Sequence, residues 1–155
     1  MSFKILVMGL PGAGKTTLAA ALAPRLRAVH LNADDIRKKI NKDLGFSPAD
    51  RIEQARRIGW LCDVIAKAGC PVIADFICPT SEARAAFLEG GTAFVVWVDR
   101  IKSGRFADTN RLFAPPERFD LRILAEGSPE FWCEQVIARL DTLPHYRQRR
   151  AAASD

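Results

Sequence analysis

A glycine-rich segment near the N-terminus has the residue types and the spacing that bind a nucleoside triphosphate. Residues 9–16, GLPGAGKT, match the pattern G-x-x-x-x-G-K-[ST] in full, after an apolar run and at the start of a helical pattern. Glycines let backbone N–H groups surround phosphate oxygens, Lys15 reaches the β and γ phosphates, and the Thr16 hydroxyl ligates Mg²⁺. The residues that we predict to bind the nucleotide are Gly9, Pro11, Gly12, Ala13, Gly14, Lys15, Thr16 and Thr17.

Carboxylates follow two of the later apolar runs. Asp34 and Asp35 come just after residues 28–32, and Asp75 lies near the end of residues 71–76. In small kinases with this loop the third strand normally lies beside the first, which predicts that Asp75 is next to the loop and Asp34 one strand further out. We therefore expect Asp75 and Thr16 to hold Mg²⁺, and Asp34 to accept the proton of an incoming hydroxyl. The alternative for Asp34 is a helix N-cap, and Asp35 suits a charge in the first helical turn.

Two further residue types indicate an anionic, aromatic acceptor. Arg37 lies three residues beyond Asp34, on about the same helical face, where its guanidinium could bind a phosphate or a sulfate. Phe46, in a Gly-Phe-Ser turn with arginines nearby, favours a surface on which a base stacks. The alternatives are a solvated surface arginine and a loop phenylalanine that fills the core.

Alternating strands and helices must position these side chains. Five short apolar runs at 3–9, 28–32, 71–76, 93–98 and 119–124 predict buried parallel strands. Helical patterns occupy 15–26, 48–68, 80–88 and 129–141, and Ser47-Pro48 and Ser128-Pro129 are typical N-cap and N1 pairs. The predicted fold is an α/β P-loop NTPase three-layer sandwich, a five-stranded parallel sheet flanked by helices in one domain over 1–143. Ligands of such sheets bind at the carboxyl ends of the strands.

Composition fits one enzyme-sized domain. The 155 residues are 48% hydrophobic and 26% charged, and no apolar run approaches the ~20 residues of a membrane span. Because the N-terminus resembles a strand more than a signal peptide, we expect a cytoplasmic protein with no membrane partner. The net charge of +5 predicts an anionic partner, which nucleotides and nucleic acids satisfy equally well. The four cysteines include no C-x-x-C pair, so we expect reduced structural thiols rather than zinc ligands.

Two segments lack clear periodicity. Residues 99–118 carry four arginines, one lysine and two prolines, and we predict a mobile lid there. Arg105 and Arg111 in that lid are candidates to neutralise charge on the transferred phosphoryl group. Residues 144–155 form a polar tail, for which we expect fraying or an oligomer contact; a homodimer is possible.

Three stretches resemble the adenylylsulfate kinase family. They are GLPGAGKTTLA, NADDIRKKINKDLGFSPADRIEQARR and FICPT, within residues 3–88. The family pattern runs from a P-loop to D-G-D-x-x-R-x-x-L-N-x-D-L-G-F-S-x-x-D-R and then F-I-S-P. The resemblance implies transfer of the γ-phosphate of ATP, with Mg²⁺, to the 3′-hydroxyl of adenosine 5′-phosphosulfate. It makes Asp34 the catalytic carboxylate and places the acceptor on Arg37, Asn41, Phe46 and Arg51. We add Lys15 and Asp75 to the expected catalytic residues and Ile77 to the expected acceptor contacts.

The chain departs from the family pattern at several positions. Asn32-Ala33 replaces Asp-Gly, Gln54 stands where an asparagine is usual, and Asp75 replaces a small residue. The long lysine-rich lid and the Phe-Thr-Gly loop of the family have no evident counterpart. A second aromatic residue against the acceptor base is either Phe106 or Phe113.

Two other functions fit parts of the sequence. The spacing Asn-x-Asp-Asp-x-x-Arg, with an aspartate ending the third run, is similar to that of polynucleotide 5′-hydroxyl kinases, whose acceptor is a hydroxyl on DNA or RNA, including a hydroxymethylated base. A nucleotide-dependent binding switch needs no acceptor. The sequence favours a kinase that acts on a small nucleotide.

Overall fold

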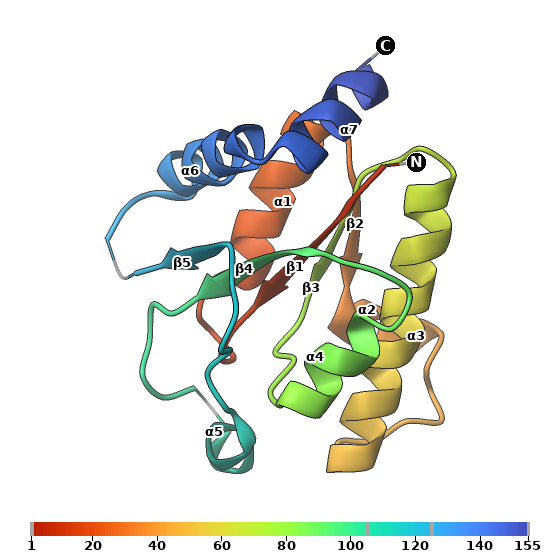
Figure 1. The fold of residues 1–155 in the computed structure, drawn as a ribbon. Coiled ribbons are helices and arrows are strands. Elements are labelled where there is room, and N and C mark those ends of the chain that lie inside the picture. The colour runs from red at the N-terminus through yellow and green to blue at the C-terminus, as the bar shows by residue number, and fades with distance from the viewer. Residues whose placement is uncertain (1, 105, 125, 155) are drawn as a thin grey trace.

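The computed structural model describes residues 2–104, 106–124 and 126–154. The strands are β1 (Lys4–Met8), β2 (Val29–Asn32), β3 (Val72–Asp75), β4 (Phe94–Val98) and β5 (Leu121–Ile123). The helices are α1 (Lys15–Leu26), α2 (Ala33–Lys39), α3 (Pro48–Lys67), α4 (Ser81–Phe87), α5 (Ala107–Leu112), α6 (Pro129–Thr142) and α7 (Pro144–Ser154). Figure 1 shows the sheet in the middle of the molecule, with helices on either side.

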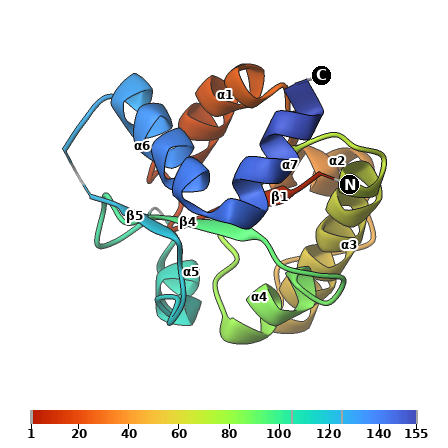
Figure 2. The same cartoon turned by 45° about the horizontal axis from the view of Figure 1, so that its top comes forward.

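The five strands form one parallel sheet in the order β2-β3-β1-β4-β5. Helices α1, α6 and α7 lie on one face of the sheet, and α3 and α4 lie on the other, as Figure 2 shows. Helix α2 packs with α3 and α4 through Ala33 and Ile36. The predicted α/β three-layer fold is therefore confirmed. The third strand does lie beside the first, and Asp75 is opposite both Val7 of β1 and Asn32 of β2.

Alternation along the strands divides the core into two parts. In β1, Ile5 and Val7 pack with α1 and α6, whereas Leu6 and Met8 pack with α3 and α4. All four side chains are fully buried. Because both faces of the middle of the sheet are covered, β1, β3 and β4 have apolar side chains at successive positions instead of every second one. This double core fixes the register that aligns the carboxyl ends of the strands.

Two helix starts have the caps that the sequence predicts. The Ser47 hydroxyl accepts a hydrogen bond from the Asp50 N–H at 3.1 Å, and Ser128 does the same for Phe131 at 3.1 Å. A proline occupies the first helical turn in both helices. Such caps satisfy backbone N–H groups that have no partner inside the helix.

The C-terminal segment differs from its prediction. Residues 144–154 form helix α7, and the Tyr146 side chain is 8% exposed. Its ring packs edge-on against Phe3 and Phe94, with centroid distances of 5.9 and 5.6 Å. One aromatic side chain thus anchors an otherwise polar helix in the core, and the oligomer contact expected for this segment stays a prediction.

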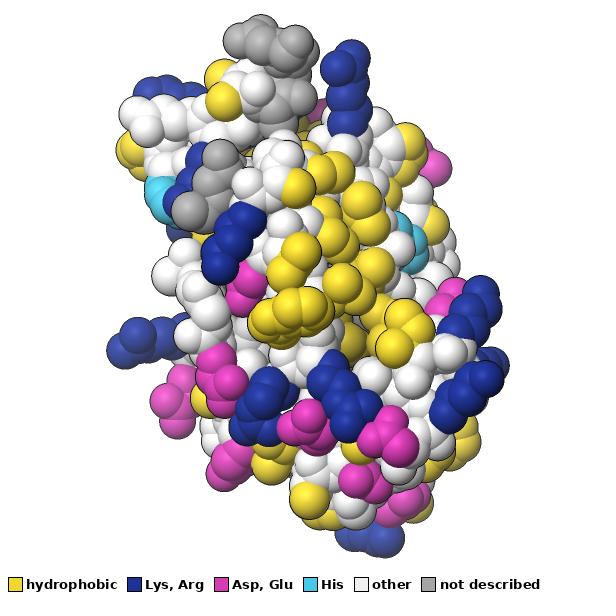
Figure 3. Space-filling model, turned by 90° about the vertical axis from the view of Figure 1, so that its right-hand side faces the viewer, with side chains coloured by type: hydrophobic (Ala, Val, Ile, Leu, Met, Phe, Trp, Pro, Cys, Tyr) yellow, Lys and Arg dark blue, Asp and Glu magenta, His cyan; other side chains and the backbone are white. Residues whose placement is uncertain are grey.

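The face formed by α3 and the edge strand β2 exposes apolar side chains. Trp60 and Val64 of α3 are 66% and 43% exposed, and Val29 of β2 is 38% exposed. Figure 3 shows apolar side chains gathered at the centre of this face, with charged side chains below them. Patches of this kind often mark contact surfaces. The homodimer expected from the sequence stays a prediction.

Within the described part of the chain, we find no helix with both the length and the apolar character that a membrane span requires.

The four cysteines are free thiols, and burial raises the pKa of Cys62 to about 12.

Candidate active site

A cavity of about 380 Å³ opens at the carboxyl ends of the strands. Five parts of the chain line it, within residues 11–16, 32–37, 46–54, 75–79 and 106–109. This is the edge at which parallel α/β sheets bind their ligands. The fold thus brings most of the predicted site residues to one place.

The loop after β1 has the shape of a phosphate cradle. Gly9 has φ +151°, and a Cβ there would lie 2.4 Å from the Val98 carbonyl oxygen, so only glycine fits. Gly14 has φ +99° and precedes α1, which begins at Lys15. The Lys15 Nζ donates to the Leu10 carbonyl at 2.8 Å, across the loop. Backbone N–H groups at such a helix start, with a lysine beside them, form an anion site.

Asp75 forms the centre of a polar cluster next to this loop. Its carboxylate accepts hydrogen bonds from the Thr16 hydroxyl at 2.9 Å and from the Asn32 amide at 3.1 Å, and it contacts His30 Nε2. Asp75 is 2% exposed. A carboxylate and a hydroxyl oxygen this close supply the hard oxygen ligands that Mg²⁺ prefers. The donor set therefore fits a magnesium ion held by Thr16 and Asp75.

Asp34 lies in the first turn of α2 and lines the cavity. It is not the N-cap: Asn32 has that role, and its side chain accepts a hydrogen bond from the Asp35 N–H at 3.1 Å. The N-cap alternative for Asp34 is therefore wrong. Its carboxylate remains available for chemistry in the cavity.

Arg37, Phe46 and Arg51 form what we call the first wall. The Phe46 ring is 64% exposed, which excludes the alternative that it fills the core. The guanidinium carbons of Arg37 and Arg51 lie 4.5 and 5.7 Å from the centroid of this ring. Burial and the neighbouring Arg51 lower the pKa of Arg37, and burial lowers the pKa of Arg51. Two partly desolvated cations around one aromatic face favour an anionic ligand with a planar ring.

Phe106, Asp108 and Thr109 form the second wall, from the segment predicted to be a lid. Arg51 donates to the Thr109 hydroxyl at 3.2 Å, which joins the two walls. Of the two aromatic candidates, Phe106 lines the cavity and Phe113 packs against the core around α3 and α4.

Only one of the two arginines predicted for the lid, Arg111, lies within the described residues. Arg111 is exposed on α5 and does not belong to the lining of the cavity, and Arg105 lies outside the described residues.

Asn41 is not brought to the cavity, although Ile77 is. Asn41 is 3% exposed, and its amide donates to Gln54 Oε1 at 2.6 Å. The structure thus places Asn41 behind the lining. Its expected contact with an acceptor would require a rearrangement of this buried bond.

His30 and Thr109 are site residues that the sequence did not reveal. His30 and Asn32 are two positions apart on β2, so both point to the same side and meet Asp75 on β3. Polar residues at alternate positions near the end of a strand were the available signal. Thr109 had no such signal, because its place depends on how residues 99–118 fold back.

The sequence of this chain is similar to those of known adenylyl-sulfate kinases. The family model described as adenylylsulphate kinase matches residues 1–111. The adenylyl-sulfate kinase of Oceanobacillus iheyensis is 43% identical over 81 residues, covering 49% of this chain and 41% of that protein. The adenylyl-sulfate kinase of Shewanella sp. (strain ANA-3) is 45% identical over 91 residues, covering 53% of this chain and 44% of that protein. The chain thus spans less than half the length of these two relatives.

A solved structure extends the match over more of the chain. The Mycobacterium tuberculosis APS kinase CysC, in complex with AMPPNP and APS, has a TM-score of 0.80 and 26% identity, covering 90% of this chain and 98% of that chain. The family match over residues 1–111, the P-loop and the order of the strands agree with one another. The chain belongs to the adenylylsulphate kinase family.

Proposed function

We propose that the protein is an ATP- and Mg²⁺-dependent kinase whose acceptor is a hydroxyl of a small nucleotide, with the 3′-hydroxyl of adenosine 5′-phosphosulfate as the best candidate. One observation carries the proposal. A single cavity is lined by Lys15 and Thr16 of the phosphate loop, by the Asp34 carboxylate, and by the arginines and the exposed phenylalanine of the first wall. These groups suit the two substrates of a phosphoryl transfer.

The loop end of the cavity would bind ATP. Backbone N–H groups from Gly12 to Thr16 would surround the phosphates, and the Lys15 ammonium would exchange the Leu10 carbonyl for phosphate oxygens. Thr16 and Asp75 would hold Mg²⁺, which when bound neutralises charge on the β and γ phosphate oxygens. Asn32 and His30 would keep the Asp75 carboxylate oriented.

The other end would bind the acceptor. Phe46 would stack on the base, and Phe106 would contact its other face. Arg37 and Arg51 would bind the phosphate and sulfate, and Ile77 would add an apolar contact. The choice of adenosine 5′-phosphosulfate as acceptor is supported by the similar Mycobacterium tuberculosis APS kinase CysC, which was solved in complex with AMPPNP and APS.

The chemical step follows from these positions. The acceptor oxygen forms a bond to the γ-phosphorus while the bond from that phosphorus to the β–γ bridging oxygen breaks, and ADP leaves. The proton of the acceptor hydroxyl passes to the Asp34 carboxylate. Arg105 and Arg111 are proposed to approach the transferred group when the lid closes.

A transfer assay tests the function. Purified protein with γ-labelled ATP and Mg²⁺ is offered adenosine 5′-phosphosulfate, single-stranded DNA and hydroxymethylated DNA in separate reactions. We expect label in the phosphosulfate product alone. Label in DNA would support the polynucleotide alternative, and hydrolysis of ATP independent of any acceptor would support a binding switch.

Replacement of Asp34 tests its assigned role. Asp34→Ala should lower kcat by about 10²- to 10⁴-fold, the usual contribution of general base catalysis, while ATP binding is retained. Titration calorimetry with a non-hydrolysable ATP analogue provides the binding control. An undiminished kcat would contradict the role.

A further inference from the structure

Gln54 of α3 is one of the most completely buried polar side chains at the cavity. It is 1% exposed, and its Nε2 donates to the Ala33 carbonyl at 3.0 Å. Its Oε1 accepts from the Asn41 amide at 2.6 Å. Both ends of this amide are therefore bound inside the protein. Turning Gln54 toward a ligand would break two buried hydrogen bonds, which is costly.

The hydrogen bond from Gln54 Nε2 ends at the beginning of helix α2. Ala33 is the first residue of α2 and directly precedes Asp34. Helix α2 has seven residues, too few to hold its own orientation, whereas α3 has 20 and packs in the core. The bond from Gln54 thus ties the start of the short helix to the long one. It acts on the turn that carries the Asp34 carboxylate.

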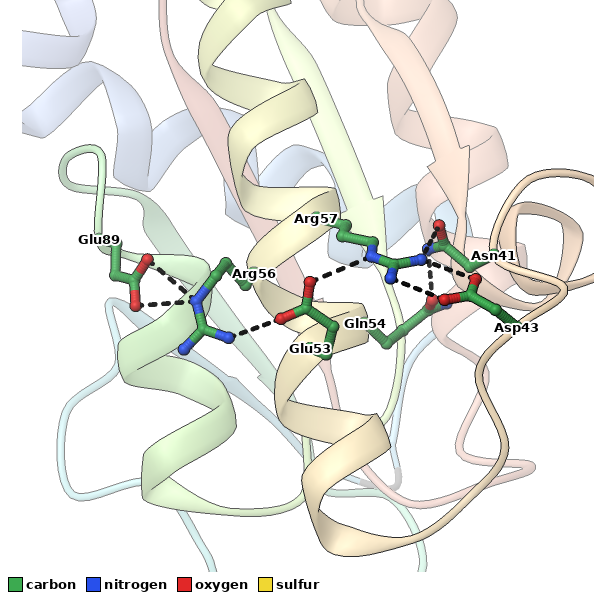
Figure 4. A network of polar contacts seen from close by, with 7 residues as sticks. All are labelled: Asn41, Asp43, Glu53, Gln54, Arg56, Arg57 and Glu89. Atoms are coloured by element: carbon green, nitrogen blue, oxygen red, sulfur yellow. Dashed lines mark hydrogen bonds and ion pairs between the residues drawn. The ribbon is translucent and has the colours of Figure 1, made fainter.

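The other end of Gln54 is held by a chain of polar contacts. The Asn41 Oδ1 accepts from Arg57 at 3.2 Å, and Arg57 makes two hydrogen bonds of 2.8 Å to the Asp43 carboxylate. The Asp43 carboxylate raises the pKa of Arg57. Figure 4 shows these side chains converging from α3 and the loop after α2. The Gln54 amide is therefore held by a series of hydrogen bonds that runs from Asp43 through Arg57 and Asn41.

We propose that Gln54 is a positioning residue that sets the placement of Asp34 in the cavity by holding the first turn of α2. Asn41 supports it from behind instead of binding the acceptor. The inference rests on the proposed function only in that Asp34 serves the acceptor hydroxyl. The tie between α3 and α2 can be measured without any acceptor.

The first test separates positioning from direct binding. Gln54→Met keeps the side-chain length but removes both hydrogen bonds. With adenosine 5′-phosphosulfate as acceptor, we expect kcat to fall about 10- to 100-fold while both KM values change by less than about threefold. A raised acceptor KM with unchanged kcat would mean that Gln54 contacts the acceptor, and that result would overturn the proposal.

A second variant and a control make the test robust to misfolding. Asn41→Ala removes the outer support but leaves the bond to Ala33, so its kcat should fall less, by about three- to tenfold. Arg56→Ala is the matched control, since Arg56 lies on the same helix, pairs with Glu53 and Glu89, and is connected to Gln54 only indirectly, through Glu53, Arg57 and Asn41. It should leave kcat within about twofold.

A measurement without acceptor tests the tie itself. Hydrogen exchange at the amides of residues 33–39 should become faster in Gln54→Met, and less so in Asn41→Ala, while α1 keeps its protection. Unchanged exchange in α2 in both variants would refute the inference. If exchange changes as expected but no transfer to adenosine 5′-phosphosulfate occurs, the proposed function fails and the positioning claim stands.

Discussion

The two walls of the cavity belong to one site but are held in place differently. In the first wall, Arg37 donates to the Gly45 carbonyl, the Gly45 N–H donates to Asp50 at 2.9 Å, and Arg51 donates to the Phe46 carbonyl at 2.9 Å. These bonds fix the turn around Phe46 against α2 and α3. The groups of this wall that we propose to bind the acceptor are therefore held in place by the protein itself.

The second wall depends mainly on bonds within its own segment. The Asn110 side chain bonds both the N–H and the carbonyl of Gly104, at 2.7 and 2.9 Å, which closes the loop before α5. Its hydrogen bond to the first wall runs from Arg51 to Thr109, and Phe106 is 56% exposed. Under the proposed function, the first wall would be the preformed surface that recognises the acceptor, and the second wall would be the segment that covers it.

Phe46→Ala should have the largest effect among changes to the walls. Loss of a stacking surface, worth about 1–3 kcal/mol per base, should raise the KM for adenosine 5′-phosphosulfate about tenfold and leave ATP binding unchanged. Steady-state kinetics measures both. Phe119→Ala is a suitable control, because Phe119 is 42% exposed and packs on Trp97 outside the cavity lining. An unchanged KM would remove Phe46 from the acceptor site.

Phe106→Ala should have a smaller effect, because its side chain belongs to the less fixed wall. We expect the acceptor KM to rise about threefold with no change in the melting temperature. Phe113→Ala should do the opposite, lowering thermal stability through lost packing against the core. If Phe113→Ala raised the acceptor KM and Phe106→Ala did not, our assignment of the second aromatic contact would be reversed.

Thr109→Val should have the smallest effect. The change keeps the side-chain shape and removes the hydrogen bond that joins the walls, so we expect the acceptor KM to rise about two- to threefold. The measurement is again steady-state kinetics. A loss of tenfold or more would show that this contact, and not the first wall alone, determines recognition.

Much of the fold and of the phosphate end of the site could be predicted from the sequence. The glycine-rich motif predicts its own position in the fold, because it is recognised together with the strand before it and the helix after it. Each strand coincides with a short apolar run in the sequence. The expectation that the third strand lies beside the first correctly placed Asp75 next to Thr16. These features follow from short-range patterns that leave few alternatives.

The acceptor end was harder to predict for a physical reason. Asn41 and Arg37 are both polar residues near a predicted loop, and spacing does not tell which side chain faces the cavity. Burial decides this, since Asn41 finds its partner in Gln54 behind the lining. Tyr146 likewise shows that one aromatic residue can dock a helix whose pattern looks disordered. Such outcomes depend on tertiary contacts that no local pattern encodes.

The rate of ADP release with and without acceptor tests the central claim most directly. The claim is that ATP at the loop and an acceptor against the first wall react within one cavity. With ATP and Mg²⁺ held constant, adenosine 5′-phosphosulfate should accelerate ADP release by the wild-type protein, and Asp34→Ala should abolish that acceleration. An equal rate of ADP release with and without adenosine 5′-phosphosulfate would contradict it.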